Sequence, residues 1–501
     1  MGTDILDVME SPALDWFGLS PLLVLLGVAL VMLVVGALTP AWPRHLATAI
    51  TSASGVAVGV LGVLLWQQVD REGASLLVNE AVYLDKTTVW AMIVAAVGIV
   101  MVSLTSDGYD EREGLAQPET HALYLLAALG AIVMAGANSL IVLFLALETM
   151  SLALYVLVAS HRRRTASQES GLKYFVLGGF SSAVFLYGVA LVYGGTGSTE
   201  IARMLVALDR QVDLDPMNET MMLAGVALII VGLAFKVGAV PFHSWVADVY
   251  QGAPTPVTSF MASVAKAAAF VAMLRVLLTG LGHWADDYRP VVAALAVITL
   301  AVGSVMAVVQ TDVKRMLAFS SVSHAGFMLV GVEAAAHVPG TLESDGASAV
   351  LLYVLVYAVL VLGTFAVVTA VAGRGDAATT LDAFRGLGRS RPVLALGMTV
   401  LLLAQAGVPL TSGFVAKFGV ISAAAGEQSY LLAVLAMVSA VIAAYLYLRI
   451  MISMWVADPA AGDDARDPVH VSRPLAAVVA ISVAFTLFVG VLPGPLVGIT
   501  P

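Results

Sequence analysis

The stretch that decides the fold reads LAFKVGAVPFHSWVADVYQGAPTPVTSFMASVAKAAAF and runs from residue 233 to residue 270. It is mostly apolar, yet it contains Lys236 and Lys266, and Pro241 interrupts it after a run of small residues. A lysine at the centre of a hydrocarbon layer costs roughly 2.5–3.5 kcal/mol, so it needs a partner, water or a functional reason to be there. The stretch therefore predicts a membrane helix that is broken beside charged groups.

The rest of the chain has the composition of a membrane protein. Of its 501 residues, 60% are hydrophobic and only 12% are charged, which is about half the charged fraction of a soluble domain. Apolar runs of roughly 20 residues, enough to cross a bilayer, recur along the whole chain. They do not alternate polar and apolar residues as barrel strands do. These features predict an all-α polytopic membrane protein embedded in a lipid bilayer.

Composition also excludes several kinds of function. The net charge is −10 and no basic domain is present, so we expect no nucleic-acid partner. The chain has no cysteine, which rules out thiolate metal sites and iron–sulfur clusters held by this chain. We find no phosphate-cradling loop, no metal-ligand spacing and no nucleophile with its base, and we expect no cofactor. The first apolar run follows an acidic N-terminus and is full length, which indicates a retained helix rather than a cleaved signal.

Fourteen segments are predicted to span the membrane. Their approximate limits are 20–38, 46–66, 86–104, 120–137, 139–160, 168–193, 219–250, 255–279, 290–309, 315–335, 348–372, 392–425, 429–456 and 475–492. Two of them, 219–250 and 392–425, would each form a helix roughly 50 Å long if unbroken. Each contains a proline, Pro241 in GAVP and Pro409 in AGVP. Proline removes a helical hydrogen bond, so both helices are predicted to break there.

The two broken helices predict an internal repeat, because interrupted helices at corresponding positions in two halves are typical of transporters built from inverted repeats. The predicted units are three transmembrane helices in 1–119, a first five-helix repeat in 120–279, a second in 290–456, and a last transmembrane helix in 457–501. The first repeat contains the break at Pro241 and the second the break at Pro409. Since five is an odd number, the two repeats are predicted to have opposite orientations.

Loop charge predicts the orientation of the chain. The loops on one side contain most of the basic residues: Arg44, Arg112, Arg162, Arg163, Arg164, Lys314, Arg315, Arg374, Arg385, Arg389, Arg391, Arg466 and Arg473. The loops on the other side contain only Arg71, Lys86, Arg203, Arg210 and Arg289. Basic loops face the inside of the cell, so both termini are predicted to lie on the outer side.

Ionisable residues inside the spans are the candidate functional site. They are Glu148, Lys173, Lys236, His243, Lys266, His324 and Lys417. Burial disfavours the charged form of a lysine and a nearby carboxylate favours it, so a Glu–Lys pair can hold or release a proton as its separation changes. A chain of such groups is typical of a proton relay rather than of a pocket for one substrate.

Each of these residues also has a structural interpretation. Glu148 would stay protonated and hold helices together, Lys173 would extend to the membrane surface, and the two histidines would be ordinary buried residues. The other three lysines lie far from the ends of their spans. Because a lysine there cannot reach the surface, a functional role is favoured for them.

Five segments carry a resemblance to a known family. They are LETMSLALYVL at 147–157, GLKYFVLGGFSSAVFLYG at 171–188, AFKVGAVPFHSWVADVYQGAPTPVTSFMASVAKAAAF at 234–270, DVKRMLAFSSVSHAGFML at 312–329 and GVPLTSGFVAKF at 407–418. With these, the chain resembles the antiporter-like membrane subunits of respiratory complex I, the bacterial NADH-quinone oxidoreductase. The resemblance extends over essentially the whole chain and is weakest at its two ends.

The resemblance implies a fold, a function and partners. Members of the family have 14 helices with two inverted five-helix repeats. They are thought to move protons, driven by electron transfer from NADH to quinone in other subunits. The chain is then expected in the inner membrane of a bacterial cell, beside other complex I membrane subunits and especially neighbouring antiporter-like subunits. It is expected to bind no cofactor and to carry out no redox chemistry itself.

The resemblance also assigns site residues. The glutamate of the family's fifth helix falls on Glu148, and the lysines of its broken seventh helix and of its eighth helix fall on Lys236 and Lys266. The residue of the twelfth helix falls on Lys417, where one sister subunit has glutamate. His243 and His324 are expected to belong to a water path between these lysines.

Two alternatives remain open at this point. A subunit of a multi-subunit sodium/proton antiporter or of a membrane-bound hydrogenase would share the fold and the lysines. A protein of another class, a structural spacer, would use its buried charges only to hold helices together.

Overall fold

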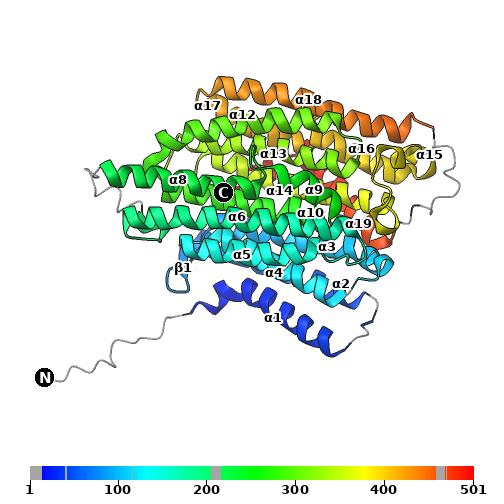
Figure 1. Ribbon diagram of the computed structural model, residues 1–501, viewed down its shortest axis with the longest axis horizontal. Coiled ribbons are helices and arrows are strands. Elements are labelled where there is room, and N and C mark those ends of the chain that lie inside the picture. Colours follow the sequence, from blue (N-terminus) through cyan, green and yellow to red (C-terminus); the bar gives the residue numbers. More distant parts are fainter. Residues whose placement is uncertain are drawn as a thin grey trace.

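The computed structural model describes residues 14–39, 42–43, 45–115, 117–204, 216–458, 469 and 471–501. Long helices run side by side through it, with α1 (Trp16–Leu38) at one edge and α18 (Tyr430–Trp455) at the opposite edge (Figure 1). The other N-terminal elements are α2 (Leu46–Glu72), the strands β1 (Ser75–Leu77) and β2 (Val82–Leu84), and α3 (Lys86–Glu113). The two strands form a short antiparallel hairpin, which the sequence analysis did not predict.

The middle of the chain contains α4 (Gln117–Gly136), α5 (Leu140–Val158), α6 (Thr165–Thr196), α8 (Pro216–Val237), α9 (Ser244–Gly252), α10 (Thr255–Phe260), η2 (Met261–Ala265), α11 (Lys266–Leu274) and η3 (Arg275–Gly280). The second half contains η4 (Gly282–Trp284), α12 (Ala285–Val309), α13 (Val313–Ala335), α14 (Asp345–Val371), η5 (Arg374–Asp376), η6 (Leu381–Phe384), α15 (Leu387–Ser390), α16 (Pro392–Ala406) and α17 (Ser412–Gly426). After α18 follow α19 (Arg473–Val491) and α20 (Gly494–Val497).

The prediction of a polytopic all-α membrane fold is confirmed. Among the described residues, 13 helices are long and apolar enough to cross a membrane, and each overlaps one predicted span. The remaining predicted span, 392–425, consists of α16 and α17, which are both shorter apolar helices. The division into two five-helix repeats stays a prediction.

Both predicted breaks are present, but a glycine rather than the proline ends each helix. α8 stops before Gly238 and α16 stops before Gly407, and these glycines have φ angles of 77° and 87°. The amide two residues past each helix end bonds to a carbonyl of the last turn, at 2.8 Å after α8 and 3.1 Å after α16. This is the Schellman arrangement, in which a left-handed glycine closes a helix. The prolines follow and prevent the helix from continuing.

The predicted span 255–279 is one continuous rod, but it is not uniformly α-helical. Residues Met261–Ala265 and Arg275–Gly280 form wider π-helical turns. Lys266 is the first residue after the first of these turns. Short π-helical segments are frequent at functional sites.

The helices differ strongly in how much protein surrounds them. Only 22% of the apolar window of α1 is buried, whereas the windows of Thr255–Gly280, α13 and α14 are fully buried. The peripheral helices expose large apolar side chains, such as Leu38 in α1 and Val441 in α18, each 75% exposed. Such surfaces are stable in lipid, so the three central segments lie at the protein-lined core of the membrane domain.

Candidate functional site

Lys236 lies at the first break, in the last turn of α8, with 6% of its surface exposed. Its Nζ donates hydrogen bonds to Ser151 Oγ on α5 at 2.7 Å and to Tyr174 Oη on α6 at 3.3 Å. The Tyr174 ring stacks on Trp245 of α9, with 4.7 Å between ring centroids. The ammonium group of α8 is therefore held by α5 and α6, and Tyr174 in turn packs on α9, the other half of the broken helix.

Glu148 lies on α5, one turn before Ser151, so the two side chains share a face of that helix. It is half-buried, and its buried Oε1 has no hydrogen-bond partner among the described residues. Buried polar atoms are almost always paired, so this oxygen marks a place for a proton or a water molecule.

Lys266 is 4% exposed and contacts α13. Its Nζ donates to the backbone oxygen of Ser321 at 2.7 Å and to Ser321 Oγ at 2.6 Å. The ring of Tyr357 on α14 lies 6.0 Å from the same nitrogen. No carboxylate contacts this lysine among the described residues. Its proton is thus held by hydroxyl, carbonyl and ring groups, which makes its charge easier to remove than that of an ion-paired lysine.

His324 lies on α13, one turn after Ser321, and is 3% exposed. Its Nδ1 is 2.8 Å from Tyr353 Oη, and its Nε2 is 3.1 Å from Tyr447 Oη. The Tyr447 hydroxyl also lies 2.6 Å from Ser320 Oγ. Both ring nitrogens thus face hydroxyl groups, which can donate or accept, so the imidazole can exchange a proton on either side.

Lys417 lies on α17, beyond the second break, and is 5% exposed. Its Nζ donates to the backbone oxygens of Gln405 at 2.9 Å and Ala406 at 3.0 Å. These carbonyls end α16 and carry the partial negative charge of a helix C-terminus. The ring of Phe327 on α13 lies 4.8 Å from the same nitrogen.

Four buried groups and the half-buried Glu148 form one row, which we call the lysine row: Glu148, Lys236, Lys266, His324 and Lys417. Lys236 connects to Lys266 through aromatic rings, because Trp245 contacts Tyr250 at 6.2 Å and the Tyr250 hydroxyl interacts with Ser321. From Ser321 onward, the residues that connect Lys266 to Lys417 lie on α13.

Three side chains on α13 form the second half of the lysine row. Ser321, His324 and Phe327 are three residues apart and therefore lie along one face of the helix. They contact Lys266, the two tyrosine hydroxyls and Lys417 in turn. A single helix face thus positions the groups between the two lysines.

Two predicted site residues lie outside the lysine row. Lys173 is 43% exposed and pairs with Glu169 at 2.7 Å and with Asp248 at 3.1 Å. Asp248 also pairs with Arg315 at 2.7 Å, which gives a surface network across α6, α9 and α13. His243 precedes α9, half-buried, and its nearest described ring contact is Phe319, at 6.4 Å.

The hydroxyl groups of the lysine row were not among the predicted site residues, although Ser320 and Ser321 belong to the serine cluster noted beside His324. These hydroxyl groups belong to Ser151, Tyr174, Ser320, Ser321, Tyr353, Tyr357 and Tyr447. Serine and tyrosine are common in membrane helices, so no composition signal distinguishes these from others. The SSVSH run at 320–324 was the one hint, because three serines cluster beside a histidine.

Buried charges also occur outside the lysine row. Asp376 follows α14 and accepts from Arg164 at 2.9 Å, Lys314 at 3.4 Å and the amide of Thr255 at 3.1 Å. Burial alone would raise the pKa of the Asp376 carboxyl, but Lys314 and Arg164 outweigh burial and hold that pKa below its usual range. All three contacts converge on Oδ2 of Asp376, where two cations neutralise the carboxylate, so this cluster is interpreted as holding segments together rather than exchanging protons.

A second polar cluster lies in the N-terminal helices. The predicted third span ends at residue 104, but α3 continues to Glu113, and Asp107 and Asp110 are 3% and 2% exposed. Asp107 pairs with His45 at 2.8 Å, and Asp110 lies 3.7 Å from His121 of α4. These carboxylates looked like loop residues in the sequence because they follow the apolar run.

The fold and the lysine row define an antiporter-like membrane protein, in which two broken helices bring lysines into the buried core. Comparison with known proteins gives the family. Residues 137–443 match the model of the NADH:quinone oxidoreductase/Mrp antiporter transmembrane family. NADH-quinone oxidoreductase subunit N of Mycobacteroides abscessus is 40% identical over 544 residues, covering 99% of this chain and 98% of its own.

Solved structures agree with this assignment. A chain of respiratory complex I from Thermus thermophilus, solved with bound aureothin, is 30% identical with a TM-score of 0.79, covering 95% of this chain and 98% of its own. A chain of the Mrp complex from a Dietzia species has a TM-score of 0.82 but is 21% identical, over 96% of each chain, so it shares the fold alone. The chain belongs to the NADH-quinone oxidoreductase subunit N family, and the resemblance to antiporter-like complex I subunits is confirmed.

Proposed function

We propose that the chain is a proton-translocating membrane subunit of a respiratory NADH-quinone oxidoreductase. Electron transfer from NADH to quinone takes place in other subunits, and this chain moves protons through the lysine row. It works beside other membrane subunits of the complex, with neighbouring antiporter-like subunits next to it, and it binds no cofactor itself. The relatives named as subunit N support this assignment.

The observation that carries the proposal is the placement of a lysine at each helix break. Lys236 and Lys417 are buried at the two breaks, and Lys266 and His324 lie between them in the contact order of the row. Hydroxyl groups contact Lys236, Lys266 and His324, backbone carbonyls and a ring contact Lys417, and no carboxylate contacts Lys266 or Lys417 among the described residues. Unpaired buried lysines would be costly in a purely structural protein.

The residues are proposed to act in sequence. Glu148 favours the charged form of Lys236. Lys236 and Lys266 exchange a proton through water and the hydroxyl groups beside Trp245 and Tyr250, and His324 passes it through water past Phe327 to Lys417. Lys417 then exchanges with the outer side. Proton transfer needs groups that hold the proton weakly and lie within hydrogen-bond reach, directly or through water.

His243 is proposed to belong to the water path between the lysines, and Lys173 to transfer protons at the surface end of that path. Both lie near α9, and the Lys173–Asp248–Arg315 network faces the surface. The bias of basic residues in the loops supports an orientation with both termini on the outer side, and the relatives named as subunit N support a location in the inner membrane of a bacterial cell. Arg44, Arg210 and Arg466, which contributed to that bias, lie outside the described residues.

Reconstitution of the assembled complex in proteoliposomes tests the proposal. Lys236→Ala and Lys417→Ala are expected to lower proton pumping per NADH oxidised while the complex stays assembled. Unchanged pumping in an assembled complex would contradict the assigned roles. Purification of the chain from its native membrane tests the partners, since NADH-oxidising peripheral subunits are expected to accompany it. Their absence beside sodium/proton antiporter subunits would favour the alternative.

A further inference from the structure

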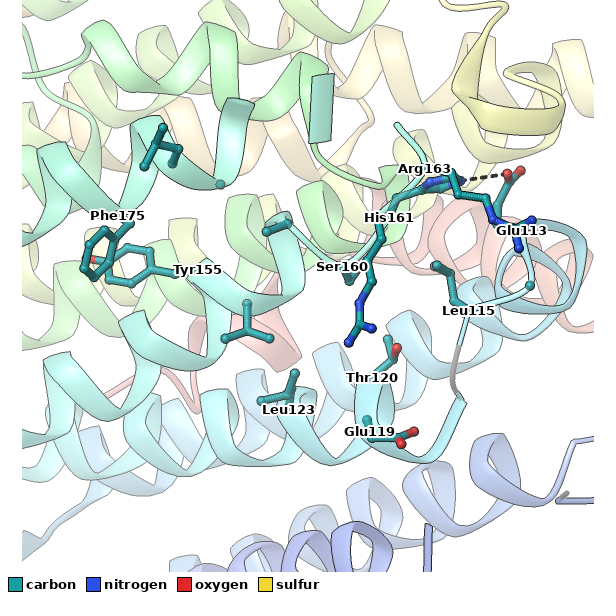
Figure 2. A pocket seen from close by; sticks show the side chains of 16 residues that line it. Glu113, Leu115, Glu119, Thr120, Leu123, Tyr155, Ser160, His161, Arg163 and Phe175 are labelled. Carbon is teal, nitrogen blue, oxygen red and sulfur yellow. Dashed lines mark hydrogen bonds and ion pairs between the residues drawn. The ribbon is translucent and has the colours of Figure 1, made fainter. Parts of the chain in front are cut away.

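A pocket of about 860 Å³ lies apart from the lysine row, between the ends of α3 and α4 and the helices α5 and α6 (Figure 2). Polar and charged residues gather at one end of it, where Figure 2 shows Glu113, Glu119, His161 and Arg163. Tyr155 and Phe175 lie at the other end. The pocket is therefore amphipathic along the direction of the helices.

The polar end has unused hydrogen-bonding capacity. Ser160 Oγ and His161 Nδ1 are buried without a partner among the described residues. His161 is 8% exposed, and its other ring nitrogen is fixed by Glu113 Oε2 at 3.1 Å. Buried polar atoms are almost always satisfied in native proteins, so a polar group is expected to fill this end.

The rim of the polar end carries charges of both signs. Arg162, Arg163 and Glu119 are exposed, and none has a side-chain ion pair within the described part of the chain. Arginine binds phosphate oxygens through paired donors. A carboxylate beside them would repel a purely anionic ligand but would attract an ammonium group on the same ligand.

The apolar end has the character of a groove for a hydrocarbon chain. Val156, Leu172 and Phe175 are 56%, 65% and 53% exposed on α5 and α6. Tyr155 closes the groove and is 7% exposed. The loop at 160–164 that forms the polar end is on the side predicted to face the inside, where headgroups meet the protein surface. The polar end of the pocket thus lies at the level of the lipid headgroups, and its apolar end lies at the level of the acyl chains.

We propose that this pocket binds one phosphatidylethanolamine molecule of the inner leaflet. The phosphate lies at Arg162 and Arg163, the primary ammonium donates to Glu119, and one acyl chain lies along Val156 and Phe175. The mixed charge selects a zwitterionic headgroup with N–H donors. Phosphatidylglycerol has no ammonium for Glu119, and the quaternary ammonium of phosphatidylcholine has no N–H to donate.

A single aromatic ring, that of Tyr155, separates the pocket from the lysine row. The Tyr155 ring contacts the Tyr174 ring at 4.8 Å, and Tyr174 accepts from Lys236. A bound acyl chain would cover the outer face of Tyr155 and exclude water from this side of the Lys236 centre.

Photolabelling of the purified complex tests the proposal. The complex is mixed with vesicles that contain phosphatidylethanolamine with a photoreactive acyl chain, and labelled peptides are identified by mass spectrometry. Label is expected on α5 and α6 near Val156 and Phe175. The double variant Arg162→Gln/Arg163→Gln is expected to lower it about tenfold, because two charge-assisted contacts are lost.

Three matched variants sharpen the result. Arg162→Lys/Arg163→Lys keeps the charge and is expected to retain labelling, which would show that the glutamine variant loses label through its lost charge. Glu119→Gln is expected to abolish the preference for phosphatidylethanolamine over phosphatidylglycerol. Arg389→Gln removes an exposed arginine that pairs with Asp458 at 2.7 Å, away from the pocket, and is expected to have no effect.

Three outcomes would overturn the proposal. One is equal labelling by all three lipids, and another is undiminished labelling in the double glutamine variant. The third is the absence of lipid label together with a cross-link from a photoreactive residue at position 172 to another polypeptide, which would show that a neighbouring subunit covers the groove.

Discussion

The ammonium group of Lys417 lies 2.9 Å from the carbonyl oxygen of Gln405, so a lysine from α17 closes the end of α16. Lys236 has a different relationship to its own break, because it precedes the break and contacts the hydroxyls of Ser151 and Tyr174. Free carbonyls at a helix end stabilise the charged form of a lysine. The two breaks therefore give their lysines different environments, as a relay with direction requires.

Gly407→Ala is expected to uncouple Lys417 from the relay. Gly407 has a φ of 87°, and an added Cβ would lie 2.9 Å from Lys417 Cδ. The substitution strains the backbone by roughly 1–2 kcal/mol and displaces the lysine from its carbonyls. Proton pumping per NADH is expected to fall by on the order of tenfold or more. Gly419→Ala is the control, since its Cβ would meet Ala349 at an ordinary 3.6 Å, and a matching loss there would contradict the interpretation.

Ser321→Ala is expected to slow proton transfer at Lys266. The variant removes one of the two oxygen acceptors of the ammonium group, at 2.6 Å. A hydrogen bond to a charged group contributes about 1.5–3 kcal/mol, which corresponds to a slowing of about tenfold or more. Ser323→Ala removes a buried hydroxyl of the same helix that has no partner among the described residues, and it is expected to pump normally. Equal rates for the two variants would show that Ser321 does not tune Lys266.

Asp376→Asn is expected to destabilise the protein without acting on the relay. The variant leaves Lys314 and Arg164 facing a neutral amide, which costs about 3–5 kcal/mol for a broken buried pair. Thermal unfolding of the purified complex measures this loss. Asparagine tolerates the left-handed φ of 51° at this position, so the backbone is not the cause.

The contacts of Asp376 with Lys314 and Arg164 also predict that the stability of the protein depends on pH. The pKa of the Asp376 carboxyl is held below its usual value by Lys314 and Arg164, against the opposing effect of burial. A carboxyl with a lowered folded-state pKa stabilises the fold fully above about pH 4 and loses that contribution as pH falls through the folded pKa. The stability difference between wild type and Asp376→Asn is expected to shrink below pH 4, and a difference that grows there would contradict this role.

Lys173→Gln is expected to affect pumping less than Lys236→Ala. Lys173 is 43% exposed and held by two carboxylates at the surface. Exposed ion pairs contribute only about 0–1 kcal/mol, so their loss is tolerated. Parallel pumping assays of the two variants measure the difference. If Lys173→Gln abolishes pumping, this lysine belongs to the relay itself.

The sequence predicted what depends on local pattern. The spans follow from apolar runs, the breaks from GAVP and AGVP, and the candidate lysines from charge in apolar surroundings. The exact ends of the broken helices differ because left-handed Gly238 and Gly407 close them before the prolines are reached. The π-helical turn before Lys266 has no local signal, since it depends on packing against other helices.

Contacts between distant segments could not be predicted in the same way. The hydroxyls that hold Lys236 come from α5 and α6, 85 and 62 residues away along the chain. Asp107 and Asp110 follow an apolar run and resembled a loop, but α3 carries them into a buried position against other helices. Lys173 lay one turn inside its predicted span, and only the folded arrangement shows that Asp248 holds it at the surface.

The most direct test of proton transfer along α13 is the number of protons pumped per NADH oxidised by the His324→Gln complex. Glutamine can keep hydrogen bonds to Tyr353 and Tyr447, which now contact the imidazole at 2.8 Å and 3.1 Å, but it cannot take up a proton. A relay through His324 predicts an assembled complex that oxidises NADH with a reduced proton yield. A normal proton yield in the assembled variant would contradict the relay and favour a structural role for the buried row.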